Sequence, residues 1–140
     1  PPPQDTSSAA SDVYKRQDQG VSALLDDLSE SGMLEDTLVM MLGEFGRTPK
    51  INGNKGRDHW GPCFFGLFAG AGVQGGQVIG RSDETAAYPA TRPYSPNDVG
   101  ATVYSLLGVP AEAVVRDRLG RPVHLNTGEV IEPLFTGAAV

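Results

Sequence analysis

Two short segments of continuous apolar sequence constrain the fold most strongly. Residues 37–42 (TLVMML) and residues 63–69 (CFFGLFA) contain no charged side chain. Runs of this length without polar alternation are typical of strands that are buried on both faces of a parallel sheet. The sequence therefore predicts an α/β protein whose central sheet is buried and mostly parallel, with helices flanking it.

Two segments show helical signals. From Asp18 onward, apolar residues recur with the spacing of one helix face, which predicts an amphipathic helix: Val21, Leu24, Leu25 and Leu28. Further along, Ser95 is a favourable N-cap, Pro96 suits the first helical position, and Asp98 lies near the positive end of the helix dipole. This second helix is expected to end at Gly108.

The remaining elements are expected to be short. The chain has 18 glycines and 11 prolines in 140 residues, so turns occupy much of it. Between residues 70 and 93 there is room only for a short strand at residues 77–79. Residues 123–125 and 129–131 flank a turn-forming segment and predict a hairpin, which a short apolar segment at residues 133–135 follows.

Composition excludes several classes of protein. The formal net charge of −6 argues against a nucleic-acid or anionic-membrane surface, which needs clustered cationic charge. One cysteine, Cys63, rules out an intrachain disulfide and a cysteine-rich metal site, so any metal must use Asp, Glu or His. No apolar run approaches the roughly 18 residues of a membrane span.

Residues 1–17 differ from the rest of the chain. They lack apolar periodicity, which predicts a disordered or non-native leader, and residues 11–17 resemble adapter-derived ends of translated metagenomic contigs. The alternative is a genuine flexible linker. In either case we assign residues 18–140 to the folded part.

The first loop whose side chains could bind a ligand or take part in catalysis spans residues 43–49, directly after an expected strand. Ligand sites of open α/β sheets lie at this end of the strands. Glu44 could bind a hard cation, and Arg47 could hold an oxyanion through its planar guanidinium. The alternative is that these two side chains form an ordinary surface ion pair.

The second loop contains adjacent Asp58 and His59, preceded by Arg57. An Asp and a His can supply an oxygen and a nitrogen ligand to one metal, or the carboxylate can orient the imidazole. The alternative is a histidine with a structural hydrogen-bonding role. Trp60 is expected to pack or to line a pocket, and His124 is expected at the surface.

The third loop, residues 70–75, has the spacing G-x-G-x-x-G. A dinucleotide site also needs a helix that opens at the last glycine and an acidic residue about 20 positions later, and the sequence predicts neither. We therefore expect a tight turn rather than an oxidoreductase fingerprint. No histidine lies at a spacing from Cys63 that would indicate a catalytic pair, so Cys63 is expected to be a small buried hydrophobic residue.

These motifs together carry a family resemblance. Residues 36–52 (DTLVMMLGEFGRTPKIN) and residues 56–60 (GRDHW) resemble a bacterial sulfatase-like family, the domain of unknown function fifteen-oh-one. The resemblance continues through residues 70–80 and 95–110 and covers residues 18–135, corresponding to the C-terminal part of that family's domain. The family is similar to the alkaline phosphatase superfamily, which implies a partial α/β sandwich of that type.

The resemblance also implies roles for particular residues. Glu44 and His59 match positions that ligate a divalent metal (Zn, Ca, Mg or Mn), and Asp58 would ligate it or orient His59. Arg47 and Arg57 would contact the ester oxyanion. Where the superfamily carries a second ligand beside the acidic residue, this sequence has Phe45, which cannot coordinate a metal.

The superfamily's nucleophile and first metal ligands lie in an N-terminal half that is absent from residues 18–140. The resemblance therefore implies the C-terminal fragment of a metal-dependent hydrolase of small-molecule or glycan phosphate or sulfate esters, inactive without that half. The alternative is a non-catalytic sulfatase-like protein with a structural or ligand-binding role. Members of the family often carry an export signal, which suggests the periplasm or cell surface.

Overall fold

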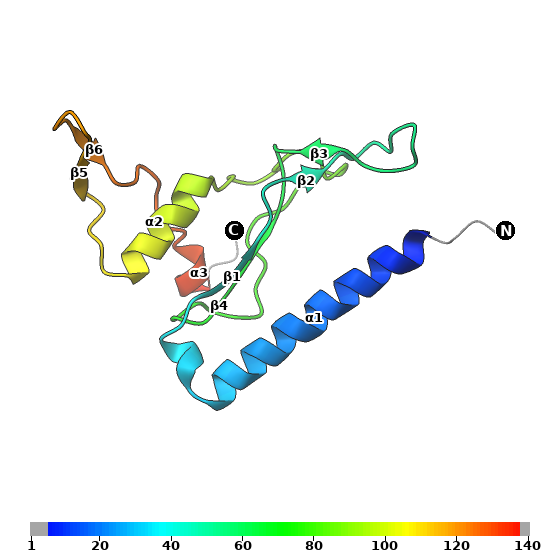
Figure 1. The fold of residues 1–140 in the computed structure, drawn as a ribbon, viewed down its shortest axis with the longest axis horizontal. Coiled ribbons are helices and arrows are strands. Elements are labelled where there is room, and N and C mark those ends of the chain that lie inside the picture. Colours follow the sequence, from blue (N-terminus) through cyan, green and yellow to red (C-terminus); the bar gives the residue numbers. More distant parts are fainter. Residues whose placement is uncertain (1–5, 138–140) are drawn as a thin grey trace.

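The computed structural model describes residues 6–137, and it describes side chains from residue 15 onward. It has a mixed α/β fold of short elements (Figure 1). In chain order the elements are α1 (Thr6–Glu30), η1 (Met33–Glu35), β1 (Val39–Leu42), β2 (Gly46–Arg47), β3 (His59–Trp60), β4 (Gly66–Ala69), α2 (Pro96–Leu106), β5 (Val114–Arg116), β6 (Pro122–His124) and α3 (Pro133–Thr136).

Helix α1 begins earlier than the sequence predicts. The helix expected from Asp18 is present, but it starts at Thr6 and continues for 25 residues to Glu30. Residues 6–17 are therefore helical where the sequence predicts a disordered or non-native leader, and residues 1–5 lie outside the described part. After the helix, Gly32 takes a left-handed conformation with φ of 74° and turns the chain into η1.

The two apolar segments pair with each other in the opposite sense from the prediction. Strands β1 and β4 run antiparallel, with Val39 opposite Ala69 and Leu42 opposite Gly66. The connection between them, residues 43–65, contains no helix and doubles back on itself, whereas parallel neighbours need a crossover. The ladder is also not buried on both faces, because Met40 and Leu42 are 39% and 48% exposed.

Two further predictions about strands are wrong. Strand β6 pairs with β5 and not with residues 129–131, because residues 117–121 form the turn. In that turn the Asp117 carboxylate accepts hydrogen bonds from the backbone N–H groups of Leu119 and Arg121. Residues 77–79 form no strand, and the neighbouring loop contains only an isolated bridge between Ser82 and Pro89.

Helix α2 confirms the strongest local prediction. Ser95 is the N-cap, Pro96 opens the helix, and Ser95 and Asp98 form a reciprocal capping box. The Ser95 backbone N–H donates to the Asp98 carboxylate at 2.6 Å, and the Asp98 N–H donates to the Ser95 hydroxyl at 3.3 Å. Gly108, with φ of 72°, follows the end of the helix as expected.

The core is formed around the C-terminal segment. We call residues 126–136 the strap, because its hydrogen bonds join α2 to residues 70–75, which we call the glycine-rich loop. Its Ile131 N–H donates to the hydroxyl of Thr102 in α2 at 3.0 Å. On the other side, the backbone N–H of Gln74 donates to the Leu134 carbonyl at 2.8 Å. Thr102, Ile131 and Leu134 are the buried residues among the described side chains.

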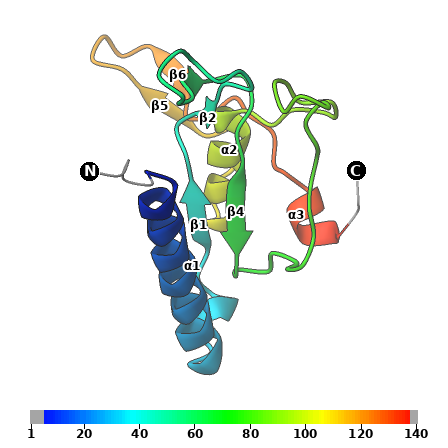
Figure 2. The same ribbon diagram turned by 90° about the vertical axis from the view of Figure 1, so that its right-hand side faces the viewer.

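The helices surround the β1–β4 ladder unevenly. Figure 2 shows α1 and α3 on opposite sides of the ladder, with α2 behind it. The β5–β6 hairpin and the loop around β2 and β3 extend away from this centre (Figure 1). Within residues 6–137, no helix has the length and apolar character needed to cross a membrane.

Candidate functional site

The loop that follows β1, residues 43–61, carries the predicted site residues, and we call it the site loop. Its two halves form the β2–β3 ladder, in which Gly46 lies opposite Trp60 and Arg47 lies opposite His59. A Cβ atom on Gly46 would collide with the carbonyl oxygen of Cys63. Glycine at this position therefore lets the chain entering the site loop pass close to the chain leaving it.

Arg57 closes the outer part of the site loop. Its Nη1 atom donates to the carbonyl oxygens of Thr48 at 2.7 Å and Pro49 at 2.5 Å. The Thr48 hydroxyl accepts from the Asp58 backbone N–H at 3.1 Å, and the Thr48 N–H donates to the Asp58 carbonyl at 3.0 Å. Arg57 thus has a structural role in holding the loop in addition to any contact with a ligand.

Asn52 organises the loop and was missed by the sequence analysis. Its side-chain oxygen accepts from the backbone N–H groups of Asn54 and Gly56, each at 3.0 Å. Its side-chain amide donates to the Asp58 carboxylate at 2.8 Å. The signal that could have found it is an asparagine close to glycines in the site loop, because in turns this side chain commonly hydrogen-bonds to the backbone two residues ahead.

An aromatic stack links the two sides of the site loop. The rings of Phe45 and His59 stack with centroids 3.7 Å apart and an interplanar angle of 22°. The guanidinium carbon of Arg47 lies 5.6 Å from the Phe45 ring centroid. Arg47 and His59 are both exposed, so this arrangement presents a guanidinium and an imidazole to solvent side by side.

The predicted metal ligands do not form a complete site. Asp58 and His59 are neighbours at the start of β3, whereas Glu44 is an exposed residue between β1 and β2. Within the described residues, no three His, Cys, Asp or Glu side chains come together as a metal site. Glu44, Asp58 and His59 are therefore not gathered into a three-ligand group within the described part of the chain.

Trp60 anchors the site loop to the following segment. Its indole N–H donates to the Ala87 carbonyl at 2.6 Å, and its ring meets Tyr88 edge-on at 5.6 Å. The accepting loop is itself held by Asp83, whose carboxylate accepts from the Ala87 N–H at 2.8 Å. This hydrogen bond is the main reason that the pKa of Asp83 lies below its ordinary value. The expectation that Trp60 packs is confirmed.

The glycine-rich loop forms a turn, as predicted. Gly70 has φ of 79°, and a Cβ atom there would collide with the carbonyl oxygen of Thr37. The Ala71 N–H then donates to the Leu34 carbonyl at 2.9 Å, which fastens the turn to η1. The residues after Gly75 are not helical, so the loop lacks the helix N-terminus that a dinucleotide site requires.

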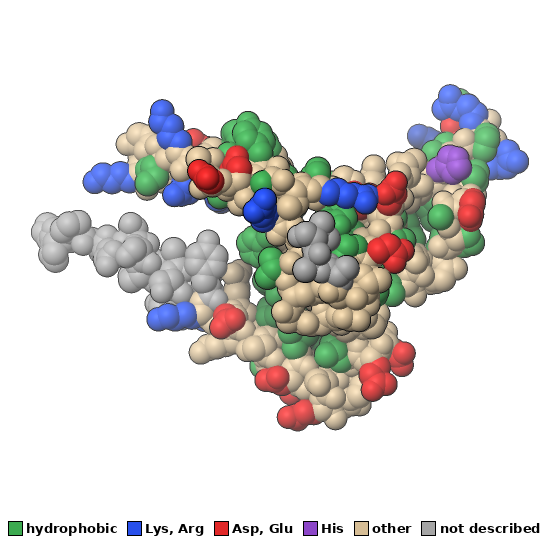
Figure 3. Space-filling model, turned by 180° about the vertical axis from the view of Figure 1, so that it is seen from behind, with side chains coloured by type: hydrophobic (Ala, Val, Ile, Leu, Met, Phe, Trp, Pro, Cys, Tyr) green, Lys and Arg blue, Asp and Glu red, His purple; other side chains and the backbone are tan. Residues whose placement is uncertain are grey.

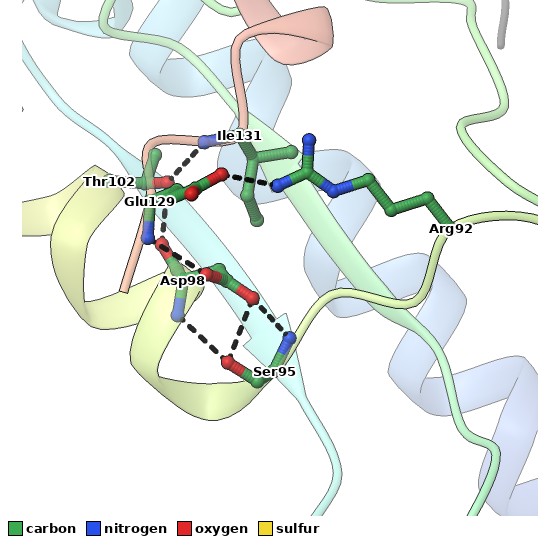
Figure 4. Close-up of polar contacts among 6 residues, drawn as sticks. All are labelled: Arg92, Ser95, Asp98, Thr102, Glu129 and Ile131. Atoms are coloured by element: carbon green, nitrogen blue, oxygen red, sulfur yellow. Dashed lines mark hydrogen bonds and ion pairs between the residues drawn. The ribbon is translucent and has the colours of Figure 1, made fainter. Parts of the chain in front are cut away.

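A second polar cluster lies where α2 meets the strap (Figure 4). The Asp98 carboxylate accepts from the Glu129 backbone N–H at 2.8 Å as well as from Ser95. The hydrogen bond from Glu129 is the largest cause of a pKa of Asp98 below its ordinary value, followed by those from Ser95. The Glu129 side chain forms an ion pair with Arg92 at 2.6 Å.

This cluster borders a cavity of about 600 Å³. Its lining includes the apolar and aromatic side chains of Tyr94, Tyr104, Val109 and Leu125, together with Arg92 and Glu129. From sequence, Asp98 is expected only near the positive end of the helix dipole, with neither Arg92 nor Glu129 beside it. Their separation of 37 residues gives no local signal.

The comparison with known sequences reaches across nearly the whole chain. The family described as "Protein of unknown function (DUF1501)" matches residues 4–135. The chain belongs to the DUF1501 family. No curated protein and no solved structure matches it. Membership confirms the family part of the resemblance, and the match extends across residues 4–17 as well as the segment from Asp18.

Proposed function

We propose that the full-length DUF1501 protein is a metal-dependent hydrolase of phosphate or sulfate esters with an alkaline-phosphatase-like α/β domain. In this proposal residues 18–140 form the C-terminal part of the domain. The observation that carries the proposal is the site loop, which pairs Arg47 with His59 and places Arg57 and Asp58 next to them. Such a combination of guanidinium, imidazole and carboxylate suits an anionic ester.

The two arginines would act on the charge of the ester. Arg47 is exposed, and its Nη1 atom donates a 3.3 Å hydrogen bond to the Arg57 carbonyl, a contact that does not involve its Nε and Nη2 atoms. Arg57 uses only Nη1 for its two loop carbonyls. Each guanidinium could therefore still donate to an oxyanion while the loop stays closed.

The metal part of the proposal depends on ligands from elsewhere in the full-length protein. A bound divalent metal would supply Lewis-acid stabilisation of charge on the ester. His59 is the residue of this chain best suited to contribute, because its exposed ring projects from a strand that Asp58 precedes. Asn52 holds the Asp58 carboxylate, so Asp58 more readily positions the neighbouring loop than completes the ligand set.

The test is a comparison of two histidine variants in the full-length protein. We expect elemental analysis to find a divalent metal in the wild type and in His124→Ala, and a reduced content in His59→Ala. His124 is the matched control because it is also exposed on a short strand. Hydrolysis of 4-nitrophenyl phosphate or sulfate should follow the metal content. Equal metal in both variants would remove His59 from the site.

A second candidate function is a non-catalytic sulfatase-like protein. The observation that favours it is the stack of Phe45 on His59, in which a ring without donor atoms covers one face of the imidazole. Absence of metal from the wild type and from both variants, together with absence of ester hydrolysis, would support this reading over the first.

A further inference from the structure

The β5–β6 hairpin is a basic arm on an acidic protein. Residues 114–124, which we call the arm, contain Arg116, Arg118 and Arg121 but only one acidic residue, Asp117. The whole chain has a formal net charge of −6. Figure 1 shows the arm projecting from the rest of the fold, beyond α2. The arm is therefore a basic projection of an acidic chain, as the site loop is.

The arm also exposes apolar side chains. The exposed fractions are 49% for Val114, 48% for Val115, 77% for Leu119 and 48% for Val123. The arginines partly stabilise the arm itself, since Arg116 donates to the Gly120 carbonyl at 2.8 Å and Arg121 pairs with Asp117 at 2.7 Å. Exposed apolar side chains surrounded by arginines are typical of surfaces that bind other proteins.

The complementary surface occurs on the same chain, at the end of α1. Residues 18–36 contain six Asp and Glu residues and no Lys or Arg. This acidic end also exposes apolar groups, with Leu24 at 47% and Met33 at 58% exposure. Asp27 follows Leu24 by three positions and lies on the same helix face. The acidic end of α1 thus has the same mixture as the arm with the opposite charge.

The two surfaces lie at different ends of the molecule. In Figure 1 the arm lies at the upper left and the acidic end of α1 at the bottom, with α2 and the β1–β4 ladder between them. Figure 3 shows basic side chains on both upper projections, one of which is the arm, and a group of acidic side chains at the base. A contact between the two surfaces therefore needs two molecules.

We propose that the arm of one molecule docks on the acidic end of α1 of a second copy of this chain. A second copy of this chain is favoured as the partner because the two surfaces carry opposite charge and both expose apolar side chains. Because the contact joins different surfaces, it can continue from copy to copy into rings or chains. The proposal does not depend on the ester hydrolase proposed above.

Ionic strength is the first test, applied to the full-length protein. Charges at exposed surfaces interact strongly only below a Debye length, so sedimentation velocity should show larger species at about 0.02 M salt than at about 0.5 M. A protein that stays monomeric at both salt concentrations, or assembles equally at both, would overturn the proposal.

Charge reversal identifies the surfaces. We expect Arg118→Glu in the arm, or Asp26→Lys combined with Asp27→Lys in α1, to weaken low-salt association by about tenfold or more. Lys50→Glu is the matched control, because Lys50 is an exposed cation in the site loop, and it should associate as the wild type does. Circular dichroism identifies any variant that has failed to fold.

A mixture of the two reversed proteins completes the test. The arm-reversed protein keeps an acidic α1, and the α1-reversed protein keeps a basic arm, so a mixture should form a complex that neither protein forms alone. Failure of the folded mixture to associate would overturn the proposal. Retention of a monomeric wild type on a sulfated polysaccharide, lost in Arg118→Glu, would also overturn it and assign the arm to an anionic polymer.

Discussion

A few side chains connect distant parts of this chain, and Thr102 is the most enclosed of them. It is completely buried, and its hydroxyl donates to the Asp98 carbonyl at 2.8 Å while it accepts from the Ile131 N–H at 3.0 Å. A buried backbone N–H without a partner costs free energy. Thr102 therefore joins α2 to the strap by satisfying a group that water cannot reach.

Replacement of this hydroxyl should destabilise the protein without changing side-chain volume. We expect Thr102→Val in the full-length protein to lower the free energy of unfolding by about 1–3 kcal/mol, because the Ile131 N–H loses its acceptor. Denaturant titration measures the change. Thr127→Val is the control, since Thr127 is exposed in the neighbouring strap, and its unfolding should be unaffected. Equal effects of the two substitutions would contradict the assigned role.

Asp98 should make the stability depend on acidity. Hydrogen bonds from Glu129 and Ser95 hold its pKa below the ordinary value, which is about 3.9. A carboxyl with a depressed pKa stabilises the fold fully above its unfolded pKa, and this stabilisation is lost as pH falls through the folded pKa. Asp98→Ala should therefore be less stable than the wild type at pH 7.

The difference between the two proteins should begin to shrink below about pH 4, where the Asp98 carboxyl of the unfolded chain takes up a proton, and should shrink further at lower pH as the folded carboxyl is protonated too. Unfolding in urea across this pH range measures it, with Asp36→Ala as a control for the loss of an exposed carboxylate. A difference that stays constant down to the acid transition would show that Asp98 acts through packing and not through its charge.

Among the elements, the strap and α2 approach each other at a glycine. Gly128 lies against the backbone of Asn97, and a Cβ atom there would collide with the Asn97 carbonyl group. The Asn126 side chain accepts from the Gly128 N–H at 2.5 Å and fixes the turn that brings the glycine into place. The lack of a side chain at Gly128 and the Asn126 hydrogen bond together allow the strap to meet the helix at this point.

A methyl group at this position should push the strap away from α2. We expect Gly128→Ala to lower the free energy of unfolding by about 1–3 kcal/mol, because the colliding atoms belong to backbone and cannot rotate aside. Gly75→Ala is the matched control, since a Cβ atom at Gly75 meets nothing within 4 Å. Thermal unfolding of both variants compares them; a Gly128→Ala protein as stable as the control would contradict the close approach.

The sequence predicts those elements whose signals are local. Ser95, Pro96 and Asp98 lie within four positions and correctly define the start of α2. The hairpin predicted around residues 126–128 is wrong: the Asn126 side chain does accept from the Gly128 N–H, but the chain there lies against α2 and not between two paired strands. Turn chemistry fixes local direction, whereas strand partners depend on contacts between residues that are distant in sequence.

The candidate site shows the same division. Adjacent Asp58 and His59 identify a loop that could bind a ligand or a metal from sequence alone. The structure then places Arg47 opposite His59. The double hydrogen bond from Arg57 to its own loop and the stack of Phe45 on His59 required the folded backbone. Residue types therefore suggested the chemistry, and only the ladder register showed which of them are neighbours.

For the molecule as a whole, little of the apolar surface is enclosed. Ile131 and Leu134 are the buried apolar residues within the described part, while Met41, Phe64 and Phe65 are 38%, 44% and 77% exposed. The β1–β4 ladder has only two strands, so its outer edges keep backbone groups that another strand could pair. Such a surface favours association with other protein segments.

Residues 18–140 expressed by themselves are therefore expected to fold incompletely. We predict a broad thermal transition without cooperativity and binding of a hydrophobic dye at low temperature, because a small core leaves little free energy to offset conformational entropy. The full-length protein, measured in parallel, should unfold cooperatively. A sharp transition of residues 18–140 that does not depend on protein concentration would contradict this prediction.

The position of the strap also has a consequence for synthesis. The residues that bury the core, Ile131 and Leu134, follow in the chain every element that they join, so they leave the ribosome after α2 and the glycine-rich loop. Helices with local hydrogen bonds can form during translation, but this core cannot close until the strap has emerged. The exposed apolar residues of β1 thus spend the interval of elongation without it, which is when a chaperone would have the most to bind.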